Sequence, residues 1–189
     1  VDAHALLGLP RELALIGFFG RFMAQKGFRT LVEAVEVMIR AGISRPFRVL
    51  TFGWGGFIRE DYQYLREKGL GDYFLQQPST DEPERWMKAL DVVAMPSRWE
   101  ACGLVAMEAL AAGVPIVGTN CIGLREVLEG SPALVVPPEN PEALAEAICR
   151  QLSSSTELRF RQYQDTAIDR FSVASAAADL RALYIGLVA

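Results

Sequence analysis

The sequence PSRWEACGLVAME, residues 96–108, marks the point around which the chain is organised. It follows a short apolar run at residues 91–95, passes through a polar loop, and continues into an almost wholly apolar segment. This order predicts a buried strand, a loop, and a helix that Gly103 opens. In open α/β sheets, helix N-termini present free N–H groups at the carboxyl ends of the strands, where ligands bind. We therefore expect a ligand site here, with an anionic group close to the amides of Gly103 and Leu104.

Two glutamates in this stretch, Glu100 and Glu108, are separated by seven residues. Glu100 precedes the helix and Glu108 lies about one and a half turns inside it, so both can face one cleft. An ionised carboxylate only accepts hydrogen bonds, and a sugar presents many hydroxyl donors. The neighbours of Glu108 are nearly all apolar, which predicts a helix buried all round and a carboxylate that reaches a partner or a cleft. Glu100 lies in a loop, where a charge needs no special explanation.

Apolar runs alternate with helical patterns along the whole chain. Strands are expected at residues 13–19, 48–52, 73–76, 91–95, 114–119 and 133–136. This alternation predicts an α/β fold, a Rossmann-like three-layer sandwich with a mostly parallel sheet, over residues 13–189. Residues 1–12 carry little pattern and are expected to be a linker remnant.

Several helices have recognisable ends. Phe28, Leu31, Val32, Val35, Met38 and Ile39 recur at helical spacing up to Gly42. Residues 79–82 have the spacing of a capping box, and Asn140 with Pro141 is typical of a helix start. A polar helix is expected at about residues 156–170. Ser172 would cap the last helix, whose inward residues are expected to be Val173, Leu180, Leu183, Tyr184 and Leu187.

The loop after the first expected strand carries two cations, Arg21 and Lys26. They could hold phosphate groups or be two solvated loop charges. The glycine-rich turn at residues 53–56 lacks the third glycine of a dinucleotide fingerprint, because position 58 is Ile58, and residues 20–27 do not match a P-loop. Neither an NAD site nor P-loop chemistry is supported.

Composition bounds the possibilities further. The chain has 189 residues, 51% of them hydrophobic, and a formal net charge of −4, which suits one α/β domain and argues against nucleic-acid or anionic-membrane partners. No apolar run approaches the roughly 20 residues of a membrane span. Three cysteines without C-x-x-C spacing fit reduced thiols in a cytoplasmic protein, and with His4 as the only histidine no Cys/His couple can be argued. No Asp-x-Asp pair occurs, so a metal has no obvious ligands and none is expected. No cofactor is expected either.

Taken together, these segments resemble the group 1 glycosyltransferases, a large retaining family with the GT-B fold of two Rossmann domains. The resemblance is carried by GRFMAQKG (20–27), the E-x7-E pair, LREVLEG (124–130) and LVVPPENPEALAEAI (134–148), and covers most of residues 13–152. Many members have Gly-Gly and Pro before the glutamate, where this chain has Ile122-Gly123 and Arg125-Glu126. That variant is similar to members acting on bacterial cell-surface polysaccharides.

The resemblance implies the C-terminal, donor-binding half of an enzyme that transfers a sugar from a nucleotide-diphosphate sugar to a glycan, lipid or small-molecule acceptor. The acceptor domain would be absent, the fragment inactive, and the full protein cytoplasmic or peripheral at the inner membrane face. Glu100, Arg21 and Lys26 would be catalytic, with Glu100 on the transferred sugar and the two cations on the diphosphate. Glu108 would hold the ribose, and further donor contacts would come from Gly103, Leu104, Cys102, Gly20, Leu75 and Gln76. A non-catalytic nucleotide- or sugar-binding module of the same fold is the alternative, and a phosphorylase-like enzyme a more distant one.

Overall fold

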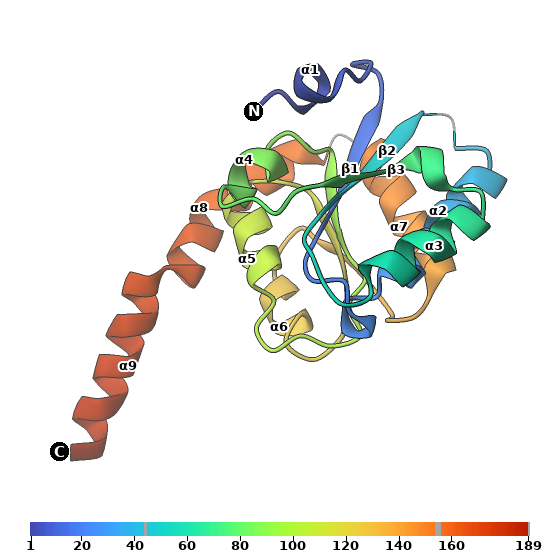
Figure 1. Cartoon of the computed structure of the whole chain (residues 1–189). Coiled ribbons are helices and arrows are strands. Elements are labelled where there is room, and N and C mark those ends of the chain that lie inside the picture. Colours follow the sequence, from blue (N-terminus) through green and yellow to red (C-terminus); the bar gives the residue numbers. More distant parts are fainter. Residues whose placement is uncertain (44, 154–155, 189) are drawn as a thin grey trace.

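The computed structural model describes residues 1–43, 45–153 and 156–188, and its described strands form one parallel sheet (Figure 1). The spatial order is β3-β2-β1-β4-β5-β6. The strands are β1 (Ala14–Phe19), β2 (Phe47–Phe52), β3 (Phe74–Gln77), β4 (Val92–Met95), β5 (Ile116–Thr119) and β6 (Leu134–Val136). Every expected strand is present within a few residues, so the α/β, Rossmann-like fold class is confirmed. The order reverses between β1 and β4, which is where such sheets open a crevice.

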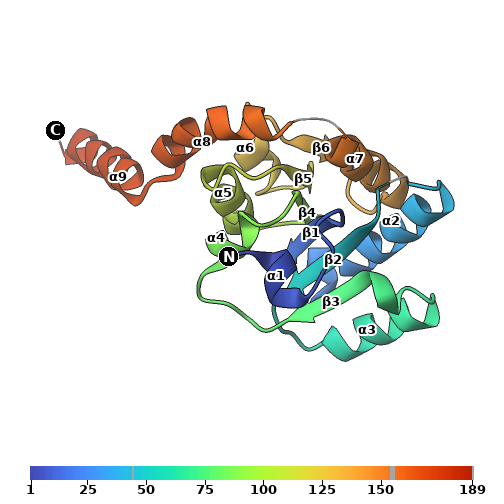
Figure 2. The ribbon, with the colours of Figure 1, turned by 90° about the horizontal axis from the view of Figure 1, so that it is seen from above.

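Helices cover both faces of the sheet (Figure 2). They are α1 (Ala3–Leu7), α2 (Phe28–Arg40), α3 (Ile58–Glu67), α4 (Pro83–Met87), α5 (Leu104–Ala111), α6 (Arg125–Leu128), α7 (Pro141–Ser153), α8 (Glu157–Phe171) and α9 (Val173–Val188), with short 3₁₀ turns η1 (Ala24–Lys26) and η2 (Gly71–Tyr73). One apolar core joins α2, α3 and α7 to the sheet, and a second joins α4, α5, α6 and α8 to its other face. Alternate residues of β1 enter the two cores, Ile16 and Phe18 on one side and Leu15 and Phe19 on the other.

The starts of α7 and α9 agree with the sequence, since the Ser175 amide donates to the Ser172 hydroxyl at 3.0 Å, but the start of α4 does not. The Asn140 side chain accepts a hydrogen bond from the Ala143 amide at 2.9 Å, and α7 begins at Pro141, as expected. The capping box at residues 79–82 is wrong: α4 has Glu82 at its N-cap and no side-chain cap. Thr80 instead accepts from the Glu82 amide at 3.1 Å in a local turn, a use of the hydroxyl that competes with helix capping.

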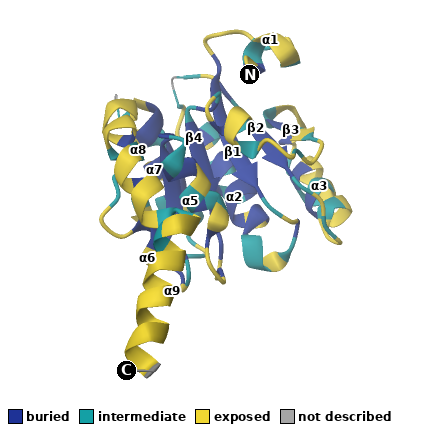
Figure 3. Cartoon of the chain, turned by 90° about the vertical axis from the view of Figure 1, so that its left-hand side faces the viewer, coloured by how far each residue is buried: buried dark blue, intermediate teal, exposed yellow. Residues whose placement is uncertain are grey.

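The two ends of the chain pack differently. Residues 1–12 hold a short helix, α1, in which the Asp2 side chain accepts from the Ala5 amide and Ala3 is buried. The residues of α9 expected to face inward are instead exposed, from 50% for Leu180 to 85% for Val173. Figures 1 and 3 show α9 leaving the body of the molecule. Helical periodicity identifies an apolar side of a helix, but it does not say what covers that side.

Candidate functional site

Three loops, those after β1, β4 and β5, meet at the carboxyl edge of the sheet, and their backbones approach one another closely. A Cβ added at Gly27, after β1, would lie 1.9 Å from the carbonyl oxygen of Pro96, after β4. A Cβ added at Gly123, after β5, would lie 1.9 Å from the carbonyl oxygen of Glu100. Both glycines also have positive φ, 67° and 77°. Only glycine allows these loops to pack backbone against backbone.

Backbone hydrogen bonds fix the loop that carries Glu100 on both sides. The Arg98 amide donates to the Gln25 carbonyl at 2.8 Å, and the Glu100 amide donates to the Ile122 carbonyl at 2.9 Å. The first bond ties the β4 loop to the β1 loop, and the second ties it to the β5 loop. The position of Glu100 is therefore set by three different segments of the chain.

The Glu100 carboxylate lies in this loop in contact with Lys26. The Lys26 ammonium donates to both carboxylate oxygens at 2.8 Å, and the Ser97 hydroxyl donates to Oε1 at 2.6 Å. The Glu100 side chain is 6% exposed and the Lys26 side chain 19%. Burial of two opposite charges is tolerated because each is paired and hydrogen-bonded. Two of the three expected catalytic residues are thus brought together.

Arg21, the third of these residues, lies just beyond Gly20 and is exposed. Within the described part of the chain, its guanidinium has no hydrogen bond or ion pair. The two loop cations therefore differ: Lys26 is already neutralised by a carboxylate, whereas the charge of Arg21 remains available to a ligand.

Polar residues that the sequence did not single out as partners complete the Glu100 environment. The Thr119 hydroxyl, at the end of β5, donates to the Ser97 carbonyl at 2.5 Å, and both residues are buried. Ser97 lies three residues before Glu100. Its role could be read from the sequence as a short polar residue beside a carboxylate, but Thr119 gives no such signal. Cys121 is also buried beside this group, and burial raises the pKa of its thiol.

The N-terminus of α5 points toward this edge, as expected. Gly103 is the N-cap with φ 64°, and no side chain caps the helix there. The first amides of a helix have no partner inside it, so the N–H groups of Gly103, Leu104 and Val105 can donate to a ligand, whereas the Ala106 amide already donates to the Gly103 carbonyl at 2.9 Å. Cys102, just before this turn, is exposed.

The expectation that α5 is buried all round is wrong. Ala106, Ala109 and Leu110 are fully buried, but Leu104 is 63% exposed and Glu108 is exposed. Glu108 lies four residues after Leu104, so the two share one open side of the helix. Although the residue as a whole is exposed, desolvation of its carboxylate by neighbouring atoms raises the pKa of Glu108, and the Glu84 carboxylate on α4 adds to this effect. No described residue forms a hydrogen bond or ion pair with the Glu108 carboxylate, which remains available to a ligand.

Two of the residues expected as donor contacts, Leu75 and Gln76, lie on β3. Leu75 is half-buried and pairs with Leu50, and Gln76 is exposed and pairs with Thr51. β3 is an edge strand, separated from β1 by β2. Gly20, at the end of β1, is covered by Lys26, whose side-chain carbons lie 3.5 to 3.8 Å from the place of an added Cβ.

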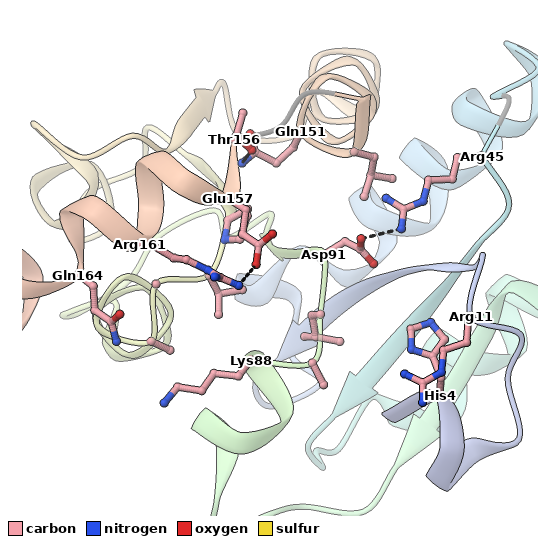
Figure 4. A pocket seen from close by; sticks show the side chains of 17 residues that line it. His4, Arg11, Arg45, Lys88, Asp91, Gln151, Thr156, Glu157, Arg161 and Gln164 are labelled. Carbon is pink, nitrogen blue, oxygen red and sulfur yellow. Dashed lines mark hydrogen bonds and ion pairs between the residues drawn. The ribbon is translucent and has the colours of Figure 1, made fainter. Parts of the chain in front are cut away.

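A separate hollow of about 760 Å³ lies at the opposite edge, where β1, β4 and β5 begin (Figure 4). Its lining includes four cations, Arg11, Arg45, Lys88 and Arg161. Three of them already form ion pairs: Arg11 with Asp2, Arg45 with Asp91, and Arg161 with Glu157. Free backbone amides and the Lys26–Glu100 pair are both at the carboxyl edge, so we place the candidate site there.

The described residues contain neither a metal-binding cluster nor a membrane-spanning helix. No group of three or more His, Cys, Asp or Glu side chains is placed to hold a metal ion. No helix within those residues has the length and apolar character needed to cross a membrane.

Comparison with known proteins adds a family and a fold. Residues 14–154 match a family model described as glycosyl transferases group 1. A D-inositol 3-phosphate glycosyltransferase of Corynebacterium urealyticum is 34% identical over 98% of this chain and 46% of its own length. The chain thus spans about half the length of the curated relatives it matches.

Two solved structures share the fold. The Anabaena protein HepE in complex with UDP and glucose superposes with a TM-score of 0.84 at 23% identity, over 97% of this chain and 51% of that chain. The C-terminal domain of a glycosyl transferase group 1 family protein from Francisella tularensis gives a TM-score of 0.70 at 23% identity, over 84% of this chain and 85% of that chain.

Proposed function

The chain belongs to the group 1 glycosyltransferases, and we propose that it is the C-terminal, donor-binding domain of a retaining enzyme that transfers a sugar from a nucleotide-diphosphate sugar. The single observation that carries this proposal is the gathering of Lys26, Glu100 and the N-terminus of α5 where β1 and β4 end. The acceptor surface would belong to a further domain, and the acceptor would be a glycan, a lipid or a small molecule.

Each charged group at this edge has a chemical task in the proposed transfer. Cleavage of the bond to the anomeric carbon leaves negative charge on the departing diphosphate and positive charge on the sugar. Arg21, Lys26 and the first amides of α5 would stabilise the diphosphate. Glu100 would accept hydrogen bonds from the hydroxyls of the transferred sugar, and Glu108 from those of the ribose.

Side-chain cations and helix amides would take the place of a divalent metal on the diphosphate. UDP is the first nucleotide to test, because the Anabaena structure contains UDP and glucose. By the resemblance at residues 120–126, the full enzyme would act on cell-surface polysaccharides, at the cytoplasmic side of the membrane.

Calorimetric titration of the chain with UDP, GDP and ADP, with EDTA present and then with Mg²⁺, tests the proposal. We expect one diphosphate to bind in EDTA and Mg²⁺ to change its affinity by less than about twofold. Titration with UDP-glucose, GDP-mannose and ADP-glucose then identifies the sugar nucleotide. A chain that binds none of the six nucleotides would refute the proposed function.

A further inference from the structure

The ion pair between Lys26 and Glu100 joins two groups that the proposed function assigns to different parts of one ligand. The ammonium is assigned to the diphosphate and the carboxylate to the sugar hydroxyls. In the structure they bind each other, with Nζ 2.8 Å from both carboxylate oxygens. A nucleotide sugar that enters the site therefore finds Lys26 and Glu100 already bound to each other.

The carboxylate has little capacity left for a further partner. It can accept about four hydrogen bonds, and three are already made, two from Lys26 and one from Ser97. It is also 6% exposed, so water contributes little. Sugar hydroxyls can bond well to Glu100 only if Lys26 moves away.

The structure allows Lys26 to move and holds Glu100 in place. The Glu100 backbone is fixed by its amide bond to Ile122 and by the close contact of its carbonyl with Gly123. Lys26 has the longer and more exposed side chain, and its stem lies over Gly20, which itself has no side chain.

We propose that donor binding divides the Lys26–Glu100 ion pair, so that Glu100 opposes binding of a bare nucleoside diphosphate and favours binding of the nucleotide sugar. The diphosphate draws the ammonium away from Glu100, and a bare diphosphate leaves a buried carboxylate with one of its partners gone. The hydroxyls of a transferred sugar restore those hydrogen bonds. This coupling rests on the proposed function, and it gives the site a means of preferring intact donor over its nucleotide product.

The substitution Glu100→Gln tests the coupling, because the coupling predicts that removing this carboxylate tightens UDP binding. Glutamine has the same shape and still accepts from Ser97, but it does not hold an ammonium as an ion pair. We expect calorimetry to show UDP binding roughly fivefold or more tighter in Glu100→Gln than in the parent chain. Binding of UDP-glucose should gain much less or weaken, so that the affinity ratio of UDP-glucose to UDP falls. If GDP binds more tightly than UDP, the comparison uses GDP and GDP-mannose. If ADP binds most tightly, it uses ADP and ADP-glucose.

Glu139→Gln is the matched control, since it removes one negative charge at the same edge of the sheet. Glu139 is exposed and pairs with Arg98 at 2.9 Å, not with Lys26. If Glu100→Gln and Glu139→Gln raise UDP affinity equally, the change in net charge alone explains the gain, and the proposal is overturned. A double-mutant cycle adds a second criterion: in a Lys26→Ala background, Glu100→Gln should no longer tighten UDP.

Ser97→Ala provides an independent variant should Glu100→Gln not fold. Without the Ser97 hydroxyl, Glu100 depends more on Lys26, so UDP should bind several-fold more weakly. Unchanged or weaker UDP binding by a folded Glu100→Gln, or unchanged binding by Ser97→Ala, overturns the coupling while the proposed function stands. Failure of the parent chain to bind any of the nucleotides overturns the proposed function and the coupling with it.

Discussion

Gly123→Ala should both destabilise the fold and disturb the position of Glu100. The new Cβ would lie 1.9 Å from the Glu100 carbonyl oxygen, whereas real Cβ contacts are essentially never shorter than 3.0 Å. The β4 and β5 loops must therefore separate by about 1.1 Å or more. That movement strains the 2.9 Å bond between the Glu100 amide and Ile122, in addition to placing alanine at a φ of 77°.

Gly130→Ala separates the two causes. Gly130 has nearly the same φ, 74°, but an added Cβ there would have nothing within 4 Å. The free energy of unfolding of Gly130→Ala should fall only by the cost of a left-handed alanine backbone, about 1–2 kcal/mol. The free energy of unfolding of Gly123→Ala should fall by that amount and also by the cost of the clash with Glu100, at least about 3 kcal/mol in all.

Urea and thermal unfolding measure the difference directly. For a domain of this size about 1 kcal/mol corresponds to roughly 2–4 °C in Tm. We expect Gly123→Ala to melt several degrees below Gly130→Ala and to bind nucleoside diphosphate differently, because Glu100 has moved. Equal unfolding free energies for the two variants would show that the close approach of Gly123 to Glu100 does not exist in solution.

Three further outcomes follow from the site. The double substitution of Arg21→Ala and Lys26→Ala should reduce nucleoside diphosphate affinity strongly, because charge-assisted hydrogen bonds contribute roughly 1.5–3 kcal/mol each; calorimetry that gives the parent affinity would exclude these cations from the diphosphate. Glu108→Gln should weaken binding of the bare diphosphate and yet stabilise the unliganded chain. The raised pKa of Glu108 means that the folded state holds its proton more tightly than the unfolded state, so ionisation costs stability once the pH rises past the unfolded value of 4.5. The Tm gain of Glu108→Gln should therefore be present at pH 7 and fade as the pH falls to about 4; a gain that is the same at both pH values would contradict the assignment to ionisation. The chain by itself should bind a nucleotide sugar but transfer no sugar, since orienting two substrates in a shared cleft contributes up to about 7–11 kcal/mol; an assay with radiolabelled UDP-glucose and candidate acceptors that shows turnover would mean that the acceptor surface lies within these residues.

The sheet could be predicted because each strand is recognisable from its own residues. β1 is buried at every position, and the sequence shows this as an unbroken apolar run. Local chemistry also predicted the start of α7, where Asn140 and Pro141 act within one turn. Each of these inferences needs only neighbouring residues.

The pairing of Lys26 with Glu100 could not be read in the same way, because 74 residues separate them. It depends on β4 lying beside β1, a property of the sheet order. The exposed sides of α5 and α9 were missed for a related reason. Their apolar residues resemble those of a core helix, and what faces them is decided by the rest of the fold.

The close backbone contacts at the carboxyl edge determine which parts of the site can be redesigned. Gly27 and Gly123 have no room for even a methyl group, so the floor of the site tolerates no change in residue type. Trp99 and Ile122, on the loops after β4 and β5, and Trp54, on the loop after β2, have 54%, 68% and 64% of their surfaces exposed. Their side chains project from fixed backbones, so substitutions there can alter the shape and polarity of the rim without moving the loops. Selection for a new donor, in nature or in the laboratory, should therefore accumulate changes at the rim and leave the floor unaltered.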